Sequence, residues 1–342
     1  MRVQTPFLKG TPKYVRAMHN NFLQPTSKPP RLFVLSLRSL SHKKGATVWL
    51  RLSKALYAGS SSVTKCRLCE EEKDLELSHI IPKFVFRHLK KTSPTGNIRS
   101  TENPNKSTQD GLKIPFLCGD CEDLFSVWET KFANEIFFKY QDGSENTFSH
   151  DTWLTKYLAS VSFRVLSYAY HEVGLDYFDE GMLRHVPTAI DRLRNYLLGK
   201  STNPGEQRQL LLLLDKASEP SDSDFNMYLV RGIEHDVLTT DKDSFVYIKY
   251  LKFLQLCPIK LSSNKGWKTA RISPNKGTLA VKDHELPDYV SNRLRKGTEI
   301  LTSSRDNISE KQASIICSRV KAVPTEKLLE SPVAKAASKH DI

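Results

Sequence analysis

The sequence CRLCEEEKDLELSHIIPKF occupies residues 66–84, and LCGDCEDLF follows at residues 117–125. Each stretch contains two cysteines separated by two residues, and 48 residues lie between the two pairs. A CxxC turn supplies two thiolates from one knuckle, so two such turns can complete a tetrahedral zinc site. The pattern therefore predicts a structural zinc ion bound by Cys66, Cys69, Cys118 and Cys121.

The other two cysteines, Cys257 and Cys317, are isolated in the sequence. A secreted protein stabilised by disulfides usually has more regular cysteine spacing over a shorter chain. Paired CxxC turns in a chain of 342 residues are instead typical of metal ligands in a reducing compartment. No apolar run in the sequence approaches the ~18 residues of a membrane span. We therefore expect a cytoplasmic protein that does not insert into membranes.

The positive charge of the chain is concentrated near its N-terminus. The formal net charge is +13, but residues 1–65 contain twelve Lys and Arg and no Asp or Glu, so the other 277 residues carry only +1. Three interpretations of this basic tail stay open: a disordered arm that binds nucleic acid, an organelle transit peptide, or a start assigned too early in the gene. We expect little regular packed structure before the first cysteine pair.

Around the cysteines the hydrophobic pattern predicts two strands and a helix. Residues 74–80 alternate apolar and polar side chains, as a half-buried strand does, and residues 114–118 form a second short apolar strand. Residues 91–111 are rich in Asn, Ser, Thr, Pro and Gly, which is typical of a loop. From Cys121 to Tyr140 the large apolar residues recur at steps of three and four, which indicates a helix.

The part of the chain after this helix contains further helices. Asp151 is placed to cap a helix over residues 152–173, and Gly199 to end another over residues 180–199. Residues 285–320 are helical in pattern, with Ser309 as a second cap.

A strand pattern interrupts these helices. Residues 244–256 are rich in β-branched and aromatic side chains and are predicted to form one strand, antiparallel to residues 226–233. The fold class predicted is therefore α+β.

The chain is expected to divide into two folded parts between its ends. The cysteine region spans residues 66–140, and a separate α+β region of unidentified role spans residues 141–325. We expect residues 326–342 to be frayed.

His79 is the residue in the cysteine region with the clearest chemical potential. It ends the predicted strand 74–80, beside a metal knuckle and a polar loop. Most single histidines are surface or core residues without a catalytic role. At this position, however, a neutral imidazole is placed to accept a proton from water. His79 is therefore a candidate general base.

The order of these motifs resembles the zinc-containing HNH, or His-Me finger, endonucleases. The resemblance rests on CRLC, LELSHIIP, STENPNKS and FLCGDCEDLF, which cover about residues 66–130. It implies a zinc-stapled, treble-clef-like ββα-metal domain that hydrolyses DNA phosphodiester bonds. By position, His79 corresponds to the general base of that family, and Asn103 or Asn105 to the residue that orients its imidazole. The four cysteines correspond to the structural zinc ligands.

The resemblance also implies a catalytic divalent cation, for which this sequence offers different ligands. The family commonly has Asp immediately before the histidine and His or Asn after the last cysteine, where this chain has Ser78 and Glu122. On a strand Glu76 faces the same side as Ser78. We therefore expect Glu76 and Glu122 to bind Mg²⁺ or Mn²⁺ through oxygen. The alternative is that both carboxylates are solvated and the domain only binds.

Four basic residues follow the histidine motif closely. They are candidates for contacts with DNA phosphates, although a run of charges is usually a solvated face. The residues are Lys83, Arg87, Lys90 and Lys91.

The sequence thus favours a metal-dependent endonuclease acting on DNA. One alternative is a non-catalytic zinc module that binds nucleic acid or protein. A second is a zinc knot that only staples the fold of a chain with another role.

Overall fold

The computed structural model describes most of the chain from Thr64 onwards, and the predicted basic tail lies outside the described residues apart from its last two. The described residues are 64–215, 223–240, 242–263, 267–282, 284 and 286–337.

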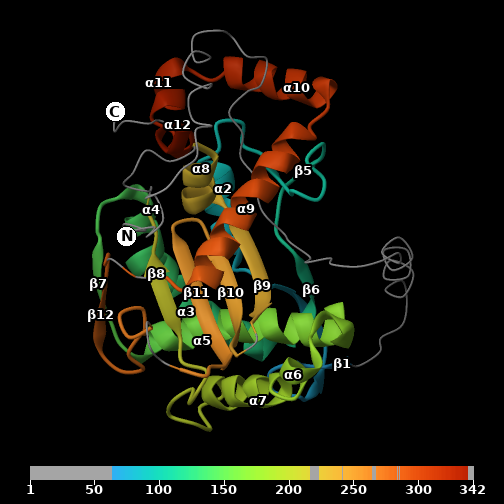
Figure 1. The fold of residues 1–342 in the computed structure, drawn as a ribbon, viewed down its shortest axis with the longest axis vertical. Coiled ribbons are helices and arrows are strands. Elements are labelled where there is room, and N and C mark those ends of the chain that lie inside the picture. The colour runs from blue at the N-terminus through green and yellow to red at the C-terminus, as the bar shows by residue number, and fades with distance from the viewer. Residues whose placement is uncertain are drawn as a thin grey trace.

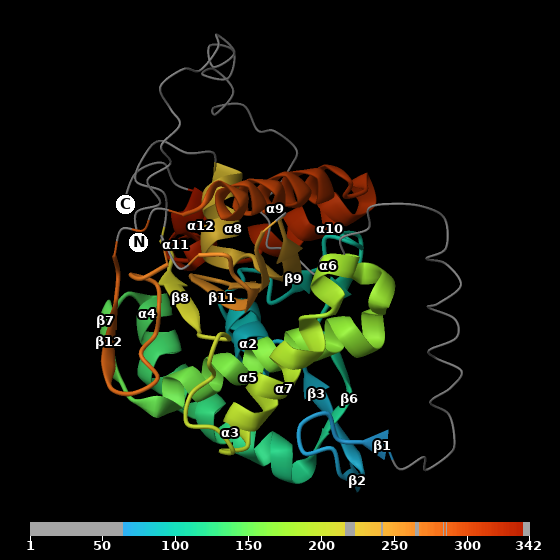
Figure 2. The same cartoon turned by 60° about the horizontal axis from the view of Figure 1, so that its bottom comes forward.

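The cysteine region begins with a pair of short strands, β1 (Thr64–Lys65) and β2 (Glu72–Lys73), which flank the first CxxC turn. Next, β3 (Leu75–His79) pairs antiparallel with β6 (Lys113–Cys118), and α3 (Gly119–Phe132) follows directly. The predicted order of strand, strand and helix is therefore confirmed. Figure 2 shows β1, β2, β3 and β6 together at one end of the molecule.

The segment between β3 and β6 is more structured than the loop that the sequence predicts. It contains α2 (Lys83–Lys91), which begins after Pro82, and a small pair of strands, β4 (Ile98–Arg99) and β5 (Ser107–Thr108). Helix α2 buries one apolar face, made by Val85, Phe86 and Leu89, against the core.

The predicted helix after Cys121 continues through a wider turn. Helix α3 passes into a π-helix, η2 (Ala133–Phe137), and then α4 (Phe138–Asp142). It ends at Gly143, whose φ of +82° is the left-handed conformation that glycine adopts at little cost. The predicted helix to Tyr140 is confirmed.

The centre of the molecule is a four-stranded antiparallel sheet with the order β8-β11-β10-β9 (Figure 1). Its strands are β8 (Leu210–Leu213), β9 (Ile233–Thr239), β10 (Ser244–Tyr250) and β11 (Phe253–Lys260).

Two details of the predicted strands are wrong. Residues 244–256 form the hairpin β10–β11 rather than one strand, because the chain reverses at Leu251, which has a φ of +50°. Residues 226–233 are mostly helix α8 (Ser223–Arg231), and the strand that pairs with β10 is β9. Residues that suit a strand also form a buried helix turn, so the apolar pattern alone did not separate the two.

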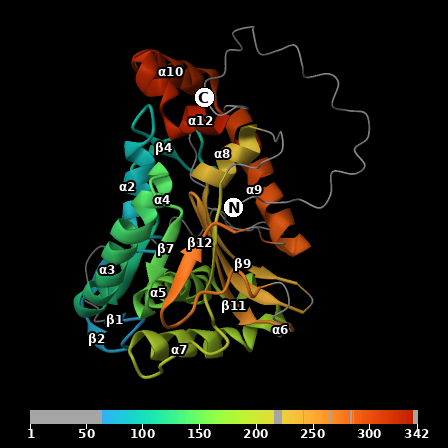
Figure 3. The same cartoon turned by 90° about the vertical axis from the view of Figure 1, so that its left-hand side faces the viewer.

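Helices cover both faces of this sheet. Helix α5 (Thr152–Tyr168), extended by the π-helix η3 (Ala169–Val173), lies against one face, and α9 (Asp288–Asp306) crosses the other (Figure 3). The predicted caps are confirmed: Asp151 Oδ1 accepts from the Trp153 amide at 3.1 Å, and Ser309 Oγ from Gln312. Among the described residues, no helix is long and apolar enough to cross a membrane.

The remaining elements surround this centre. Strands β7 (Thr147–His150) and β12 (Gly277–Ala280) form an antiparallel pair at one edge. The other elements are η4 (Leu175–Tyr177), α6 (Glu180–Leu183), α7 (Val186–Leu197), α10 (Glu310–Lys321), α11 (Thr325–Leu329) and α12 (Pro332–Ala337).

The C-terminal residues are not frayed as far as they are described. Helix α12 packs on α8, and Val333 and Ala336 are buried there. Residues 338–342 lie outside the described part of the chain. The expectation failed because SPVAKAAS is short and weakly apolar, and only its tertiary contact with α8 stabilises it.

The predicted separate region after residue 140 shares one hydrophobic core with the cysteine region. Phe132 of α3 stacks on Tyr157 of α5 with ring centroids 4.0 Å apart, and also packs against Phe253 of the central sheet. The Tyr140 hydroxyl donates to the carbonyl of Leu214 at 2.9 Å. Residue 140 is therefore no boundary in the packing.

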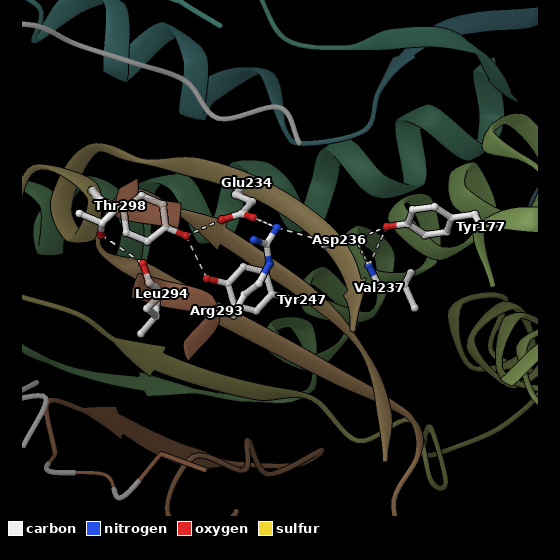
Figure 4. A network of polar contacts seen from close by, with 9 residues as sticks. Tyr177, Glu234, Asp236, Val237, Tyr247, Arg293, Leu294 and Thr298 are labelled. Atoms are coloured by element: carbon white, nitrogen blue, oxygen red, sulfur yellow. Dashed lines mark hydrogen bonds and ion pairs between the residues drawn. The ribbon is translucent and has the colours of Figure 1, made fainter. Parts of the chain in front are cut away.

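A buried polar network binds α9 to the central sheet (Figure 4). The Arg293 guanidinium forms ion pairs with Glu234 and, at 2.9 Å, with Asp236, and all three side chains are at most 8% exposed. Tyr177 donates to Asp236, whose pKa burial raises to about 6. The Tyr228 hydroxyl donates to Glu234. The buried Arg293 cation is therefore paired with buried carboxylates, and without such a partner a charge inside a protein would be strongly destabilising.

Candidate metal centre and histidine site

The four predicted zinc ligands come together. The first pair lies in the turn after β1, and the second lies where β6 ends and α3 begins. All four sulfur atoms lie within 4.8 Å of one another, and the Sγ atoms of Cys69 and Cys118 are 3.8 Å apart. Zinc bonded to sulfur at ~2.3 Å in a tetrahedron separates its ligands by about 3.8 Å. The arrangement therefore fits a zinc ion without rearrangement of the backbone.

Hydrogen bonds within the cluster shift the pKa values of Cys66 and Cys121 in opposite directions. The hydrogen bond with Cys121 lowers the pKa of Cys66 to about 4 and raises that of Cys121. The amide of Cys118 also donates to Cys66 Sγ at 3.3 Å. A metal ion bound here would replace the shared protons, so its binding would release protons to solvent.

His79 lies at the end of β3 and is paired with a carboxylate that the sequence analysis did not single out. Its Nε2 atom is 2.9 Å from Oδ2 of Asp110. The Asp110 carboxylate also accepts from the Gly111 amide at 3.0 Å and lies 3.6 Å from the Lys113 ammonium. Burial alone would raise the pKa of Asp110, but these contacts together hold it below its usual value. Asp110 is therefore an anion that can orient an imidazole N–H.

The other ring nitrogen of His79 is free to meet a substrate. No described residue makes a hydrogen bond to Nδ1, and this atom is not among the fully buried polar atoms that lack partners. With Nε2–H donating to Asp110, Nδ1 carries the lone pair. The side chain is 12% exposed, so the ring is held firmly while one edge reaches solvent.

A buried arginine fixes the backbone at the same point. Arg164 of α5 donates through Nη1 to the His79 carbonyl at 2.9 Å, and its Nη2 atom lies 2.6 Å from Glu129 of α3. Its guanidinium lies over the ring of Phe125. Arg164 therefore joins β3, α3 and α5 beneath the imidazole.

Two sequence signals for these partners were present. Asp110 belongs to an Asp-Gly turn before the second strand, where a Cβ on Gly111 would lie 2.2 Å from the ring of Phe86. Arg164 is a lone charge within the buried stretch of α5. A buried charge inside a helix needs a partner, which makes such a residue worth attention in the sequence.

Ser78 does not stand in for the metal-binding aspartate of the HNH family. It is buried, and its hydroxyl accepts from the Leu117 amide at 3.2 Å and donates to the Glu76 carbonyl at 3.4 Å. A β-bulge lies between Glu76 and Leu77. The extra residue at this bulge is Phe116 of β6, so the alternation of β3 itself is not interrupted. Glu76 is exposed while Ser78 is buried, so the two side chains have different environments, and their facing the same side stays a prediction.

Glu122 is different, because its environment leaves one oxygen without a partner. Its Oε1 atom is buried and has no hydrogen bond among the described residues. It lies one turn before Phe125 on the side of α3 that faces α5. An orphaned carboxylate oxygen suits a cation ligand. Apart from the cysteines, however, no group of three or more possible ligating side chains comes together in the described part of the chain.

Asn105, predicted to orient His79, has other partners. Its amide nitrogen donates to the Asn307 carbonyl at 3.1 Å, and its oxygen accepts from the Ser309 amide at 2.8 Å. Asn105 therefore fastens the loop after β4 to the connection between α9 and α10. Asp110, which lies on the same segment between β3 and β6, contacts the His79 imidazole instead of Asn105.

The predicted basic residues form one stripe on α2. Lys83, Arg87 and Lys91 are exposed and follow one another at four-residue steps, opposite the buried face of the helix. Lys90 donates to Gln109 at 3.3 Å. Helix α2 starts four residues after His79, so the stripe begins close to the imidazole in the chain.

The comparisons with known proteins add no relative. No family model, no curated protein and no solved structure matches the chain.

Proposed function

We propose that the chain is a metal-dependent endonuclease that hydrolyses DNA phosphodiester bonds, with His79 as its general base. The observation that supports this most is the His79–Asp110 pair, 2.9 Å apart beside a four-cysteine zinc site. A histidine held by a carboxylate on one nitrogen and open on the other is the usual arrangement of a catalytic base.

In this proposal, His79 Nδ1 accepts a proton from a water molecule. The water oxygen forms a bond to phosphorus, the bond from phosphorus to the leaving oxygen breaks, and that oxygen takes a proton from solvent to become a hydroxyl. The Asp110 carboxylate stabilises the imidazolium that results, because it already accepts from Nε2–H. Arg164 keeps the imidazole in place through the His79 carbonyl.

Two metal ions have separate roles in the proposal. Zinc bound by the four cysteines would hold the turn after β1 against the start of α3 and the end of β6, the strand that pairs with β3. A Mg²⁺ or Mn²⁺ ion would be held by Glu122, with its remaining positions filled by water and phosphate oxygens. Such an ion, when bound, neutralises charge on the phosphate. Glu76 is not part of this proposed site, because its side chain is exposed, whereas one oxygen of Glu122 is buried without a partner.

The α2 stripe provides the proposed contact with DNA. Lys83, Arg87 and Lys91 would neutralise successive phosphates without reading bases. Binding should therefore weaken with salt and depend little on sequence.

A specific observation also supports the alternative of a non-catalytic zinc module. The Ser78 hydroxyl is taken up by the backbone of Leu117 and Glu76, and apart from the cysteines no group of three or more possible metal ligands comes together in the described residues. In this alternative the protein would bind DNA along α2 without cleaving it.

A nicking assay on supercoiled DNA separates these functions. With Mg²⁺ or Mn²⁺, His79→Ala should lose about 10²-fold or more of the cleavage rate, since a general base contributes that much, while DNA binding persists. His171→Ala, which removes an exposed histidine on η3, is the matched control and should cleave like the wild type. Equal cleavage by His79→Ala would rule out this site, and binding without any cleavage would favour the zinc module.

A further inference from the structure

A pocket of about 270 Å³ lies away from the histidine site, where the segment leading into β8 meets the chain before β12. Arg208 and Arg271 are its charged lining residues. Pro204, Ile272 and Pro274 supply an apolar wall. No acidic residue lines this pocket.

Backbone pairing brings the two arginines to the same side. Arg271 forms an antiparallel bridge with Leu210, and the Ile272 amide donates to the Gln209 carbonyl at 3.0 Å. Arg208 lies two residues from Leu210, so its side chain projects to the same face as that of Arg271. Such diagonal neighbours lie roughly 7–8 Å apart, which allows both guanidinium groups to reach one ligand.

Neither guanidinium has a side-chain partner among the described residues. Within the described ranges, no ion pair or side-chain hydrogen bond joins Arg208 or Arg271 to any carboxylate, and the Nε atom of Arg208 is buried without a hydrogen bond. By contrast, the nearby Arg192 is paired with Glu206. A buried donor left without a partner destabilises a folded protein, and a ligand that accepts from it removes this cost.

We propose that this pocket binds a phosphate group carrying two negative charges, either as a free ion or as a small organic monoester. Two guanidinium forks match the charge of a phosphate monoester near neutral pH and its oxygen geometry. The apolar wall would contact the uncharged part of an ester. The pocket volume of about 270 Å³ lies just below the range of about 300–1,000 Å³ for drug-sized ligands, which suits a smaller ligand.

Calorimetric titration of the full chain with inorganic phosphate and with phenyl phosphate tests the proposal, at matched ionic strength. We expect one saturable site, with tighter binding of phenyl phosphate if the ligand is an ester and equal binding if it is the free ion. Arg271→Gln and Arg208→Gln should each weaken binding about tenfold or more, because each removes a charge-assisted hydrogen bond. Binding should also weaken below pH of about 6, where the phosphate gains a proton.

Arg192→Gln is the matched control, since it removes an exposed charge close by without touching the pocket. Arg271 is exposed, so its substitution should leave the melting temperature unchanged even if Arg208→Gln is unstable. The proposal is wrong if neither probe binds up to about 10 mM. It is also wrong if Arg271→Gln binds phenyl phosphate as tightly as the Arg192→Gln control.

Discussion

The cysteine region and the central sheet are held together in different ways. The sheets of the cysteine region have only two strands each, and β3 exposes both Glu76 and Leu77. In the central sheet every residue of β10 is buried, because helices cover both faces. A two-stranded sheet is barely stable alone, whereas a covered four-stranded sheet is stabilised by a distributed apolar core.

The difference explains where reactive groups are placed. The cysteine region shares the common apolar core but also brings four cysteines together, and its His79 and Asp110 side chains stay partly exposed. The central sheet neutralises its charges internally, with Arg293 between Glu234 and Asp236. Loss of a metal from the four cysteines should therefore destabilise the cysteine region most. Loss of the Arg293 side chain should destabilise the central sheet most.

The largest expected effect comes from breaking the zinc site. Cys118→Ser should lose bound zinc and unfold the β3–β6–α3 unit, because structural zinc contributes on the order of 10 kcal/mol to local folding. Elemental analysis and hydrogen exchange measure the two effects. Cys317→Ser, outside the cluster, should keep its zinc. Wild-type zinc content and unchanged amide protection in Cys118→Ser would contradict this account of the region.

The next largest effect concerns the buried network. Arg293→Met should lower the free energy of unfolding by about 3–5 kcal/mol, because two carboxylates would stay buried without a cation. Urea unfolding measures it, with Arg295→Met, an exposed position on the same helix, as the control. Adding Glu234→Gln and Asp236→Asn to Arg293→Met should recover most of the loss. If Arg293→Met unfolds like the control, the network does not stabilise α9 on the sheet.

A smaller expected effect is the pH dependence of stability that His88 of α2 gives to the cysteine region. Burial lowers the pKa of His88, which packs against Phe137 and Phe138, to about 4 from an ordinary 6.5. Between these values the unfolded chain binds more protons than the folded one, so stability should fall as pH drops from 6.5 towards 4.

Replacing His88 isolates this contribution. His88→Phe keeps a ring and should reduce the slope of stability against pH by up to one proton, which is about 1.4 kcal/mol per pH unit. Urea unfolding from pH 7 to pH 5 measures the slope, and the comparison at pH 8 supplies the baseline. Parallel curves for the two proteins would show that His88 is not kept neutral by the fold.

Local patterns predicted the elements that local chemistry decides. The meeting of the four cysteines, the strands β3 and β6 and the caps Asp151 and Ser309 follow from short-range spacing and pattern, and the structure confirms them. The partners of His79 do not follow in this way. Asp110 and Arg164 are 31 and 85 residues distant along the chain and meet His79 only after the segments have packed.

The errors have equally definite causes. Glu76 is exposed while Ser78, two residues later on the same strand, is buried, a difference in packing that no alternation rule anticipates. Asn105 was chosen by resemblance, but the α9–α10 connection engages both ends of its amide. Long-range contacts thus decided the candidate site more than local propensity did.

The measurement that tests the proposed site most directly is a double-mutant cycle of cleavage rates for His79→Ala and Asp110→Asn. If Asp110 acts by orienting the imidazole, Asp110→Asn alone should slow cleavage by about 10–100-fold, as expected for a carboxylate behind a functional histidine. In the His79→Ala background the same change should have no further effect. An equal loss from Asp110→Asn in both backgrounds would show that Asp110 acts independently of His79 and would contradict the proposed pair.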